Sequence, residues 1–441
     1  MILIYTEKRT PRVEYIFNQI LCNILGFKIT FTQDLQEAQQ ASLPVINYSN
    51  ALMANAIQVK PAGLLTQKGI DGNLKPEVLV GKKRKIMFCT NRETLEFDLF
   101  SAGFYLITRY EEYVNREVDK HGRFIAQNSI AFKNQFLVEP LVDQWANDFK
   151  EQVLAKFPGT PCNQPEFRFI PVIDIDNTFA FKHKGFIQNT YGLLHDLFKG
   201  EYKLVKIRLK TLFRLQEDPF YRFNFMTELH DYYKLTPLYF VLRGGYGTYD
   251  RLTIYPSWSE HQKLRKLART DIVGFLVSYK SAFNLHLIKK EIRKLERIAK
   301  KKILLSRFHC ARFHLPESYR MLVKLGVQKD FSMGYASVVG FRASTSFPFY
   351  FYDLERETVT SLQVHSYVIM DRTLKDVLKL QRREVVGIAR TLADRVAKVN
   401  GVYMTVFHNE AFSKLPEWEK WRDVYRAILK RGAAIVQKEE Y

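Results

Sequence analysis

The sequence predicts an α/β protein in which an N-terminal α/β domain is followed by a parallel (β/α) barrel. Three observations predict this architecture. The chain has 441 residues, which exceeds the length of one ordinary domain. A proline-rich segment interrupts it where neither a helix nor a central strand can continue. Beyond that segment, apolar runs alternate with amphipathic helical patterns, which is typical of parallel βα units, and the length suits a barrel.

Short strands and helices are both expected in the N-terminal domain. The apolar runs Ile2–Tyr5 and Lys28–Thr32 predict strands, and Phe97–Val114 predicts a helical segment. A further helix closes the domain, because apolar residues recur there at helical spacing. These residues are Val142, Trp145, Phe149 and Val153. The expected units of the chain are the N-terminal domain at 1–157, a proline-rich linker at 158–166 and the barrel at 167–441.

The barrel is expected from a series of strand-forming runs with helical patterns between them. One such helix carries Ile288, Ile292, Leu295 and Ile298 on one face and lysine and arginine on the other. The predicted strands are Phe167–Ile175, Leu238–Leu242, Ile272–Leu276, Ile303–Leu305, Val338–Phe341 and Val402–Phe407.

Composition and charge limit the classes of protein. Hydrophobic residues make up 46% and charged residues 26% of the chain, which indicates a globular protein without low complexity. The four cysteines are scattered and no signal peptide or membrane-spanning run is present, so we expect a cytoplasmic protein. The net charge of +21 attracts polyanions. Without a nucleic-acid motif, we expect no specific nucleic-acid partner, whereas peripheral contact with an anionic membrane stays open.

Candidate functional residues follow the predicted strands, because the loops after parallel strands build the mouth of a barrel. Asp174 and Asp176 end the first strand, and side chains two apart on a strand point to the same side. Two neighbouring carboxylates favour a cation or a shared proton between them. The alternative is that both are acids that cap the next helix.

A histidine and two arginines stand at other strand ends. His408 follows the last strand, where an imidazole can exchange protons near neutral pH, although a structural histidine is the more common case. Arg307, with His309 two residues on, and Arg342 can each orient a carboxylate or neutralise developing negative charge. Either arginine could equally form a buried ion pair that ties the barrel together.

The order of these motifs resembles a bacterial branch of the polysaccharide deacetylases, carbohydrate esterase family four, that carries an extra N-terminal domain of unknown function. The resemblance spans nearly the whole chain, including Phe97–Tyr113 and His121–Phe124 of the first domain. The motifs that carry it in the barrel are Asp174-x-Asp176, Ile272–Ser281, Arg307-x-His309, Asp330–Tyr335, Gly340–Thr345, Met370-Asp371 and Phe407–Asn409.

The resemblance implies a distorted, incomplete (β/α) barrel that removes acetyl groups from nitrogen or oxygen of sugars with a divalent metal, commonly zinc. It implies that Asp174 is the general base, His408 the general acid and Arg307 the group that positions the base. Asp176 and His309 are the implied metal-binding residues. The implied substrate-binding residues are Tyr279, Tyr335 and Arg342.

One motif departs from the family. The branch usually has His-Pro-Ser-Tyr at the strand Ile272–Leu276, where this chain has Leu276-Val277-Ser278-Tyr279. Lys280 stands where the wider family has its second histidine. Leucine offers no lone pair and an ammonium repels a cation, whereas a catalytic zinc ordinarily has three protein ligands. We therefore expect weak metal binding or none, with Lys280 paired to Asp176 as one way to fill the place of the cation.

Three hypotheses about function remain open. The chain is an active deacetylase with an altered metal site, as the retained acids and His408 suggest. Alternatively, it is a catalytically inactive relative that binds carbohydrate or acts in assembly, as Leu276 and Lys280 suggest. The third hypothesis, supported only by composition, is a basic protein that binds an anionic polymer or membrane surface.

Overall fold

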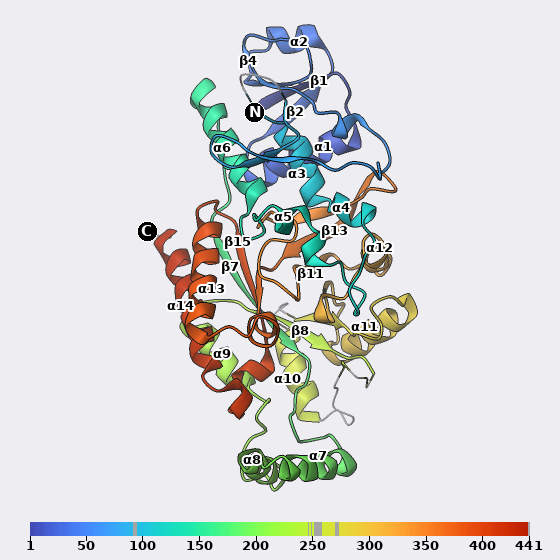
Figure 1. Ribbon diagram of the computed structural model, residues 1–441, viewed down its shortest axis with the longest axis vertical. Coiled ribbons are helices and arrows are strands. Elements are labelled where there is room, and N and C mark those ends of the chain that lie inside the picture. Colours follow the sequence, from blue (N-terminus) through green and yellow to red (C-terminus); the bar gives the residue numbers. More distant parts are fainter. Residues whose placement is uncertain (91–94, 246, 248, 251–257, 270–272, 440–441) are drawn as a thin grey trace.

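The computed structural model describes residues 1–441 apart from 91–94, 246, 248, 251–257, 270–272 and 440–441. It is an elongated molecule of mixed α/β structure, as expected from the sequence (Figure 1). The N-terminal residues form one end, and the two antiparallel helices α7 (Phe186–Phe198) and α8 (Tyr202–Leu212) project at the other. Among the described residues, no helix combines the length and the hydrophobicity needed to cross a bilayer.

A small parallel sheet organises the N-terminal part. Its strands are in the order β2-β1-β3-β4, and all neighbours are parallel. Helices cover it, and a separate antiparallel pair, β5 (Val78–Val80) and β6 (Lys85–Met87), lies beside it. The sheet comprises β1 (Ile2–Thr6), β2 (Ile29–Thr32), β3 (Val45–Tyr48) and β4 (Ala56–Val59). The helices are α1 (Pro11–Phe17), α2 (Leu35–Gln40), α3 (Leu99–Ile107), α4 (Tyr110–Val114), α5 (Ile130–Lys133) and α6 (Leu141–Lys156).

The rest of the chain is built on one nine-stranded sheet in the order β12-β13-β11-β10-β9-β8-β7-β15-β14. All neighbours are parallel except β12 and β13, which form an antiparallel hairpin at one edge. The strands are β7 (Arg168–Ile175), β8 (Leu238–Leu242), β9 (Val273–Val277), β10 (Leu305–Phe308), β11 (Lys329–Met333), β12 (Phe349–Asp353), β13 (Thr358–Ser366), β14 (Ile369–Met370) and β15 (Val402–His408).

The sheet is curled around an apolar cluster of its own. Strands from opposite halves, such as β11 and β14, contribute to this one cluster, so the sheet forms part of a barrel wall around it. The cluster consists of Val172, Phe240, Leu242, Leu276, Phe331, Tyr367, Met370, Met404 and Val406. Helices surround the outer face: α9 (Phe223–Tyr232), α10 (Trp258–Ala268), α11 (Leu285–Ala299), α12 (Glu317–Lys324), α13 (Arg382–Ala397) and α14 (Trp421–Glu439).

Three predicted elements differ from the structure. The predicted strand Ile303–Leu305 overlaps β10 only at Leu305. The apolar run Val338–Phe341 is not a strand, because Gly340 has a φ of 129° and the next residue, Phe341, donates its N–H to the carbonyl of Leu137 in the N-terminal part. The helical segment Phe97–Val114 is broken into α3 and α4 at Arg109, whose φ of 57° is left-handed. Of the predicted strand Ile272–Leu276, Ile272 lies outside the described residues.

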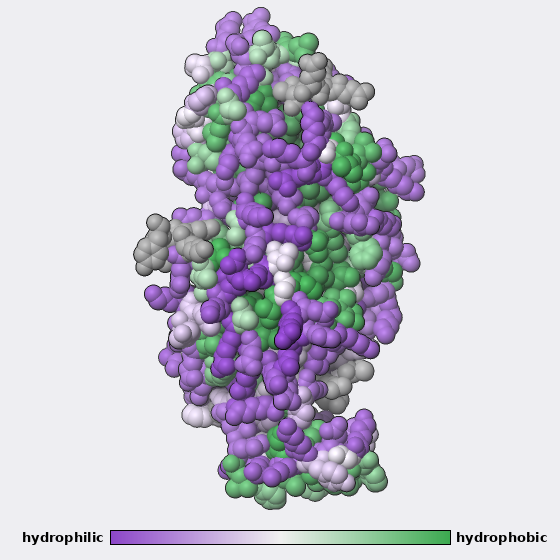
Figure 2. Space-filling model, turned by 60° about the vertical axis from the view of Figure 1, so that its left-hand side comes forward, coloured by the Kyte–Doolittle hydropathy of each residue, from purple (hydrophilic) through white to green (hydrophobic). Residues whose placement is uncertain are grey.

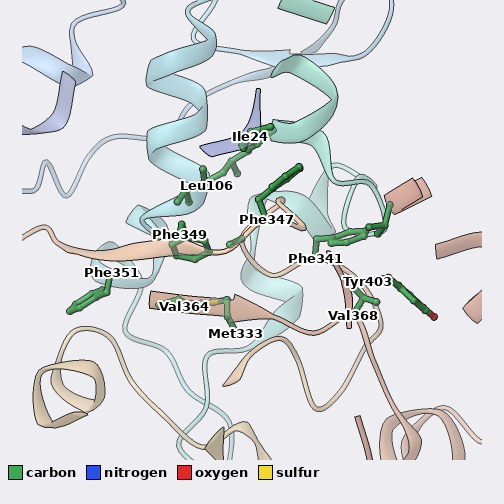
Figure 3. Packing of buried hydrophobic residues seen from close by; sticks show 14 of the residues in the cluster. Ile24, Leu106, Met333, Phe341, Phe347, Phe349, Phe351, Val364, Val368 and Tyr403 are labelled. Carbon is green, nitrogen blue, oxygen red and sulfur yellow. The ribbon is translucent and has the colours of Figure 1, made fainter. Parts of the chain in front are cut away.

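One large apolar core runs through both parts of the molecule. In Figure 3, Leu106 of the N-terminal part lies next to Phe349 of the large sheet, and Ile24 and Val364 belong to the same buried cluster. Aromatic contacts join the same parts, since the ring centroid of Tyr352 in β12 lies 5.2 Å from that of Phe104 in α3. The hairpin β12–β13 is therefore buried on one face by α1 and α3 and does not end the sheet in solvent.

Candidate functional site

Asp174 and His408 lie side by side at the carboxyl ends of two neighbouring parallel strands. They are register partners in β7 and β15. Oδ2 of Asp174 lies 3.9 Å from Nε2 of His408. Asp176, which follows β7, brings its Oδ2 to 3.6 Å from the same nitrogen. The two acids therefore face one site, as side chains two apart on a strand should.

Arg307 holds the carboxylate of Asp174. Its Nε donates to Oδ2 of Asp174 at 2.8 Å, and its Nη1 donates to the carbonyl of Phe331 at 2.7 Å. The guanidinium also lies 4.4 Å from the ring centroid of Tyr367. Burial raises the pKa of Asp174, although the charges of Arg307 and His408 oppose that shift. The result is a fixed carboxylate that is more basic than an exposed aspartate.

Asp371 holds His408. Its Oδ1 lies 2.6 Å from Nδ1 of the imidazole, and its Oδ2 accepts the backbone N–H of His408 at 2.8 Å. Burial alone would lower the pKa of this histidine, but the charges of Asp371 and Asp176 outweigh it and raise the pKa to about 9. His408 is therefore protonated at neutral pH, with Nδ1 directed at Asp371 and Nε2 at the two acids.

His309 lies between two other acids. Its Nε2 is 3.2 Å from Oδ2 of Asp176, and its Nδ1 is 3.0 Å from Oδ1 of Asp250. Asp250 in turn accepts the backbone N–H groups of Tyr279 and Lys280 at 2.8 and 3.0 Å. Burial opposes protonation of His309, yet the neighbouring negative charges raise its pKa well above the usual value. The pKa of Asp176 is lowered, because the positive charges of His309 and His408 outweigh the effect of burial.

These groups open into a cavity of about 950 Å³. Asp176, His309 and His408 are part of its wall, and Cys310 lies beside them. Helices α7 and α8 and their connection form another part of the wall. Their contribution includes Asp196, Lys199, Glu201, Leu204 and Arg208. The cavity is large enough for a sugar-sized ligand, and Asp176, His309 and His408 reach its wall.

Two buried carboxylate oxygens of the site have no hydrogen-bond partner among the described residues. They are Oδ1 of Asp174 and Oδ1 of Asp176. A buried carboxylate oxygen without a donor is costly, so each is a natural acceptor for a water, a substrate group or a cation. The chemistry that the site supports is therefore proton transfer between a carboxylate and an imidazolium across a bound group.

The described residues do not complete a zinc site. No group of three or more histidine, cysteine or acidic side chains among them is arranged to hold a metal ion. Asp176 and His309 contact each other, but the second nitrogen of His309 faces Asp250. Leu276 is buried in the apolar cluster inside the sheet. Lys280 is exposed, and Asp176 pairs with imidazoles, so the expected pairing of Lys280 with Asp176 is wrong.

The three expected substrate-binding residues take other places. Arg342 donates to both carboxylate oxygens of Glu112, at 2.8 and 2.6 Å, which is the buried ion pair considered as its alternative role. The hydroxyl of Tyr335 lies 3.2 Å from Nη2 of Arg109. Neither Arg342 nor Tyr335 is among the described residues that line the cavity. The hydroxyl of Tyr279 lies 3.0 Å from Nδ1 of His121, a residue of the cavity wall.

Asp371 and Asp250 are the site residues that sequence analysis did not assign. Asp371 lies within the Met370-Asp371 motif directly after β14, so its place at a strand end was a usable signal. Asp250 lies well beyond the end of β8 in the chain, and its contact with His309 spans 59 residues. Only the folded chain brings that pair together.

Comparisons with known proteins show remote resemblances. A model for a family of unknown function (DUF7033) matches residues 2–158. No curated protein sequence matches the chain. One similar solved structure, from Mycobacterium smegmatis, is provisionally assigned as a polysaccharide deacetylase; the TM-score is 0.38 at 11% identity, over 63% of this chain and 88% of that one.

Two further solved structures are carbohydrate-active enzymes. The 4-α-glucanotransferase of Thermococcus litoralis gives a TM-score of 0.36 at 13% identity, over 62% of this chain and 38% of that one. A GH138 enzyme targeting pectin rhamnogalacturonan II gives a TM-score of 0.27 at 12% identity, over 98% of this chain and 63% of that one. These resemblances assign neither a family nor an activity to this chain.

Proposed function

We propose that this protein is a hydrolase of the polysaccharide deacetylase type, in which Asp174 is the general base and His408 the general acid. The observation that supports the proposal is that the two groups lie side by side, with His408 in the cavity wall, and that a neighbouring side chain fixes each of them. Arg307 fixes Asp174, whose pKa burial raises. Asp371 fixes His408, whose pKa of about 9 keeps it protonated. An acid and a base poised in this way are what acyl hydrolysis needs.

In the proposed reaction, water attacks the carbonyl carbon of an acetyl group on a sugar nitrogen or oxygen. The unpartnered Oδ1 of Asp174 accepts a proton from that water as the new C–O bond forms. Nε2 of His408 donates its proton to the leaving amine or alcohol as the bond to the carbonyl carbon breaks. Asp371 retains its contact with Nδ1 and stabilises the imidazolium before transfer. The products are acetate and the deacetylated sugar.

We infer that this chain has fewer metal ligands than the family uses. A divalent metal, commonly zinc, polarises the acetyl carbonyl in polysaccharide deacetylases. Asp176 and His309 are the donors that remain, and Leu276 supplies none. Two donors are fewer than a catalytic zinc ordinarily takes. Weak metal affinity and slow turnover follow, and no proton transfer above depends on the metal.

A second function is favoured by one observation. Both nitrogens of His309 face acids of the protein, and Leu276 belongs to the apolar cluster inside the sheet, which suits a site that has stopped binding metal. In that case the cavity binds an acetylated carbohydrate without turnover, as a binding or assembly module. Fold and cavity do not by themselves require activity.

The test measures acetate release from N-acetylated and O-acetylated oligosaccharides, together with their binding by calorimetry. The proposal expects release that Asp174→Asn and His408→Gln each abolish while sugar binding remains. The matched control is Asp394→Asn, which removes an acid paired with Arg431 on α13 and α14. Sugar binding without acetate release supports the second function, a carbohydrate-binding or assembly module. Binding of DNA or another anionic polymer, with no sugar binding, supports the third hypothesis and contradicts both.

A further inference from the structure

The helical hairpin α7–α8 presents an apolar face that no described element covers. Ile187, Tyr191, Leu194 and Phe198 follow one another at spacings of four, three and four residues, so they form one stripe along α7. Their exposed fractions are 83%, 73%, 49% and 90%. Phe186 at the start of the helix is 85% exposed. An exposed patch of this kind on a monomer marks an interaction site.

The second helix continues the apolar face and adds a row of positive charge. Tyr202 at its start is exposed, as are Phe213 and Leu215 just beyond its end. Four exposed basic residues recur along α8 and just beyond its end at spacings of three, four and four residues. They are Lys203, Lys206, Lys210 and Arg214. Residues 182–215 contain eight lysines and arginines against two acidic residues, a formal net charge of +6. Figure 2 shows hydrophobic side chains along the free end of the molecule formed by this hairpin, with hydrophilic ones above them.

The inner side of the hairpin is well packed, so the exposed face is not a sign of a loose element. Arg208 of α8 donates to Oδ2 of Asp196 in α7 at 3.0 and 2.7 Å. The same guanidinium lies 4.5 Å from the ring centroid of Phe181. Leu204 and Ile207 pack against a buried cluster that includes Phe181, Phe220 and Leu415. The hairpin therefore has one face fixed to the body and one face directed outward.

We propose that the hairpin α7–α8 docks this protein on the surface of an anionic membrane. Helices that lie in a bilayer interface combine an apolar face rich in large residues with lysine and arginine on the polar face. Tyrosine side chains suit the headgroup level, where Tyr191 and Tyr202 would lie, while Phe186 and Phe198 would insert with the apolar face. Lysine stems lie along the apolar zone while their ammonium groups reach anionic headgroups.

A protein partner fits this face less well, because lysine is depleted at the core of protein interfaces. The two helices also project beyond the rest of the molecule, so the apolar stripe can meet a flat surface without obstruction (Figure 1). Since the same hairpin forms part of the cavity wall, docking would hold the cavity at the membrane surface.

The test is co-sedimentation of the full chain with lipid vesicles. We expect binding to vesicles of phosphatidylcholine in which about a third of the lipid is phosphatidylglycerol, and much weaker binding to phosphatidylcholine alone. Substituting Ile187→Ser, Tyr191→Ser and Phe198→Ser together should weaken partitioning by about a thousandfold, because each inserted apolar side chain contributes roughly tenfold. The control is Leu52→Ser, at an apolar residue that is 78% exposed in the N-terminal part.

A second variant tests how much the lysine charges contribute to vesicle binding. Lys206→Gln with Lys210→Gln should weaken binding to the anionic vesicles by about twentyfold, since each lysine near the surface contributes roughly fivefold. Lys289→Gln with Lys290→Gln removes the same charge from the exposed side of α11 and should change little. Equal losses in both pairs, or no binding by the unmodified chain, would overturn the proposal. So would self-association in analytical ultracentrifugation that the triple serine variant abolishes, which would assign the face to a second copy of this chain.

Discussion

Arg342 and Glu112 form a bidentate ion pair between residues that are 230 positions apart, with Nε and Nη2 donating at 2.8 and 2.6 Å. Nε of Arg109 donates to the same carboxylate at 2.8 Å. Burial alone would raise the pKa of Glu112, but the two guanidinium groups outweigh it and lower the pKa to about 2. One carboxylate therefore balances two buried cations where α4 meets the loop after β11.

Glu112→Gln should destabilise the protein strongly, because it leaves two buried guanidinium groups without their negative partner. Breaking such a pair costs about 3 kcal/mol or more. The measurement is the midpoint of urea unfolding. As a control, Glu139→Gln removes the partner of Arg395, an ion pair in which both side chains are about 30% exposed, and should cost about 1 kcal/mol or less. Similar costs for the two variants would contradict the role given to Glu112.

The stabilising effect of Glu112 should depend on pH. Its pKa is about 2 in the folded protein and about 4.3 in an unfolded chain. A lowered carboxyl pKa stabilises the fold above the unfolded value, and the stabilisation is lost as pH falls toward the folded value. The difference in unfolding free energy between wild type and Glu112→Gln should therefore shrink below about pH 4, by roughly 1.4 kcal/mol per pH unit. A difference that stays constant down to about pH 3 would be inconsistent with this ionisation.

Asp371→Asn should lower the pKa of His408. The wild-type value is about 9 and depends mainly on the negative charge of Asp371 against the effect of burial. Loss of a neighbouring opposite charge shifts a pKa by about one to three units. Titration of histidine ring signals by NMR in selectively labelled protein measures the shift. Asp394→Asn, which removes an acid from a surface pair on α13 and α14, serves as the control and should leave His408 unchanged.

Leu276→His should raise zinc occupancy, if the resemblance places this position correctly in the family's ligand set. Lys280 is exposed and does not pair with Asp176, so the single substitution should suffice without Lys280→Ala. Metal analysis after dialysis against zinc measures the outcome, with the wild type expected well below one zinc per chain. Leu242→His is the matched control, because Leu242 lies beside Leu276 in register and in the same apolar cluster. Equal gains in both variants would point to nonspecific binding by a buried imidazole.

The sequence predicted the parts of the fold that depend on local pattern. Strands β7, β8 and β15 and helix α6 lie where apolar periodicity placed them, within a residue or two. The run Val338–Phe341 was misleading because Phe341 has its only fully buried hydrophobic side chain, and the N–H of Phe341 bonds to Leu137 of the N-terminal part rather than to a neighbouring strand. Position at a strand end indicated Asp174 and His408 as candidates, and their roles came only from the resemblance. Position at a strand end does not distinguish Arg307, which contacts Asp174, from Arg342, which contacts Glu112. Both partners lie far away in the sequence.

The continuous core between the two sheets has a consequence for how this chain can change during evolution. Tyr352 of β12 packs on Tyr15 and Phe104 from the first hundred or so residues, with ring centroids 5.1 and 5.2 Å away. A barrel separated from its N-terminal part would therefore lose the cover of its edge hairpin and expose a strand edge with aromatic side chains, which invites aggregation. The two parts are expected to fold and unfold together and to be inherited as a pair. Exchange of either one by recombination would succeed only with a partner that brings the matching surface.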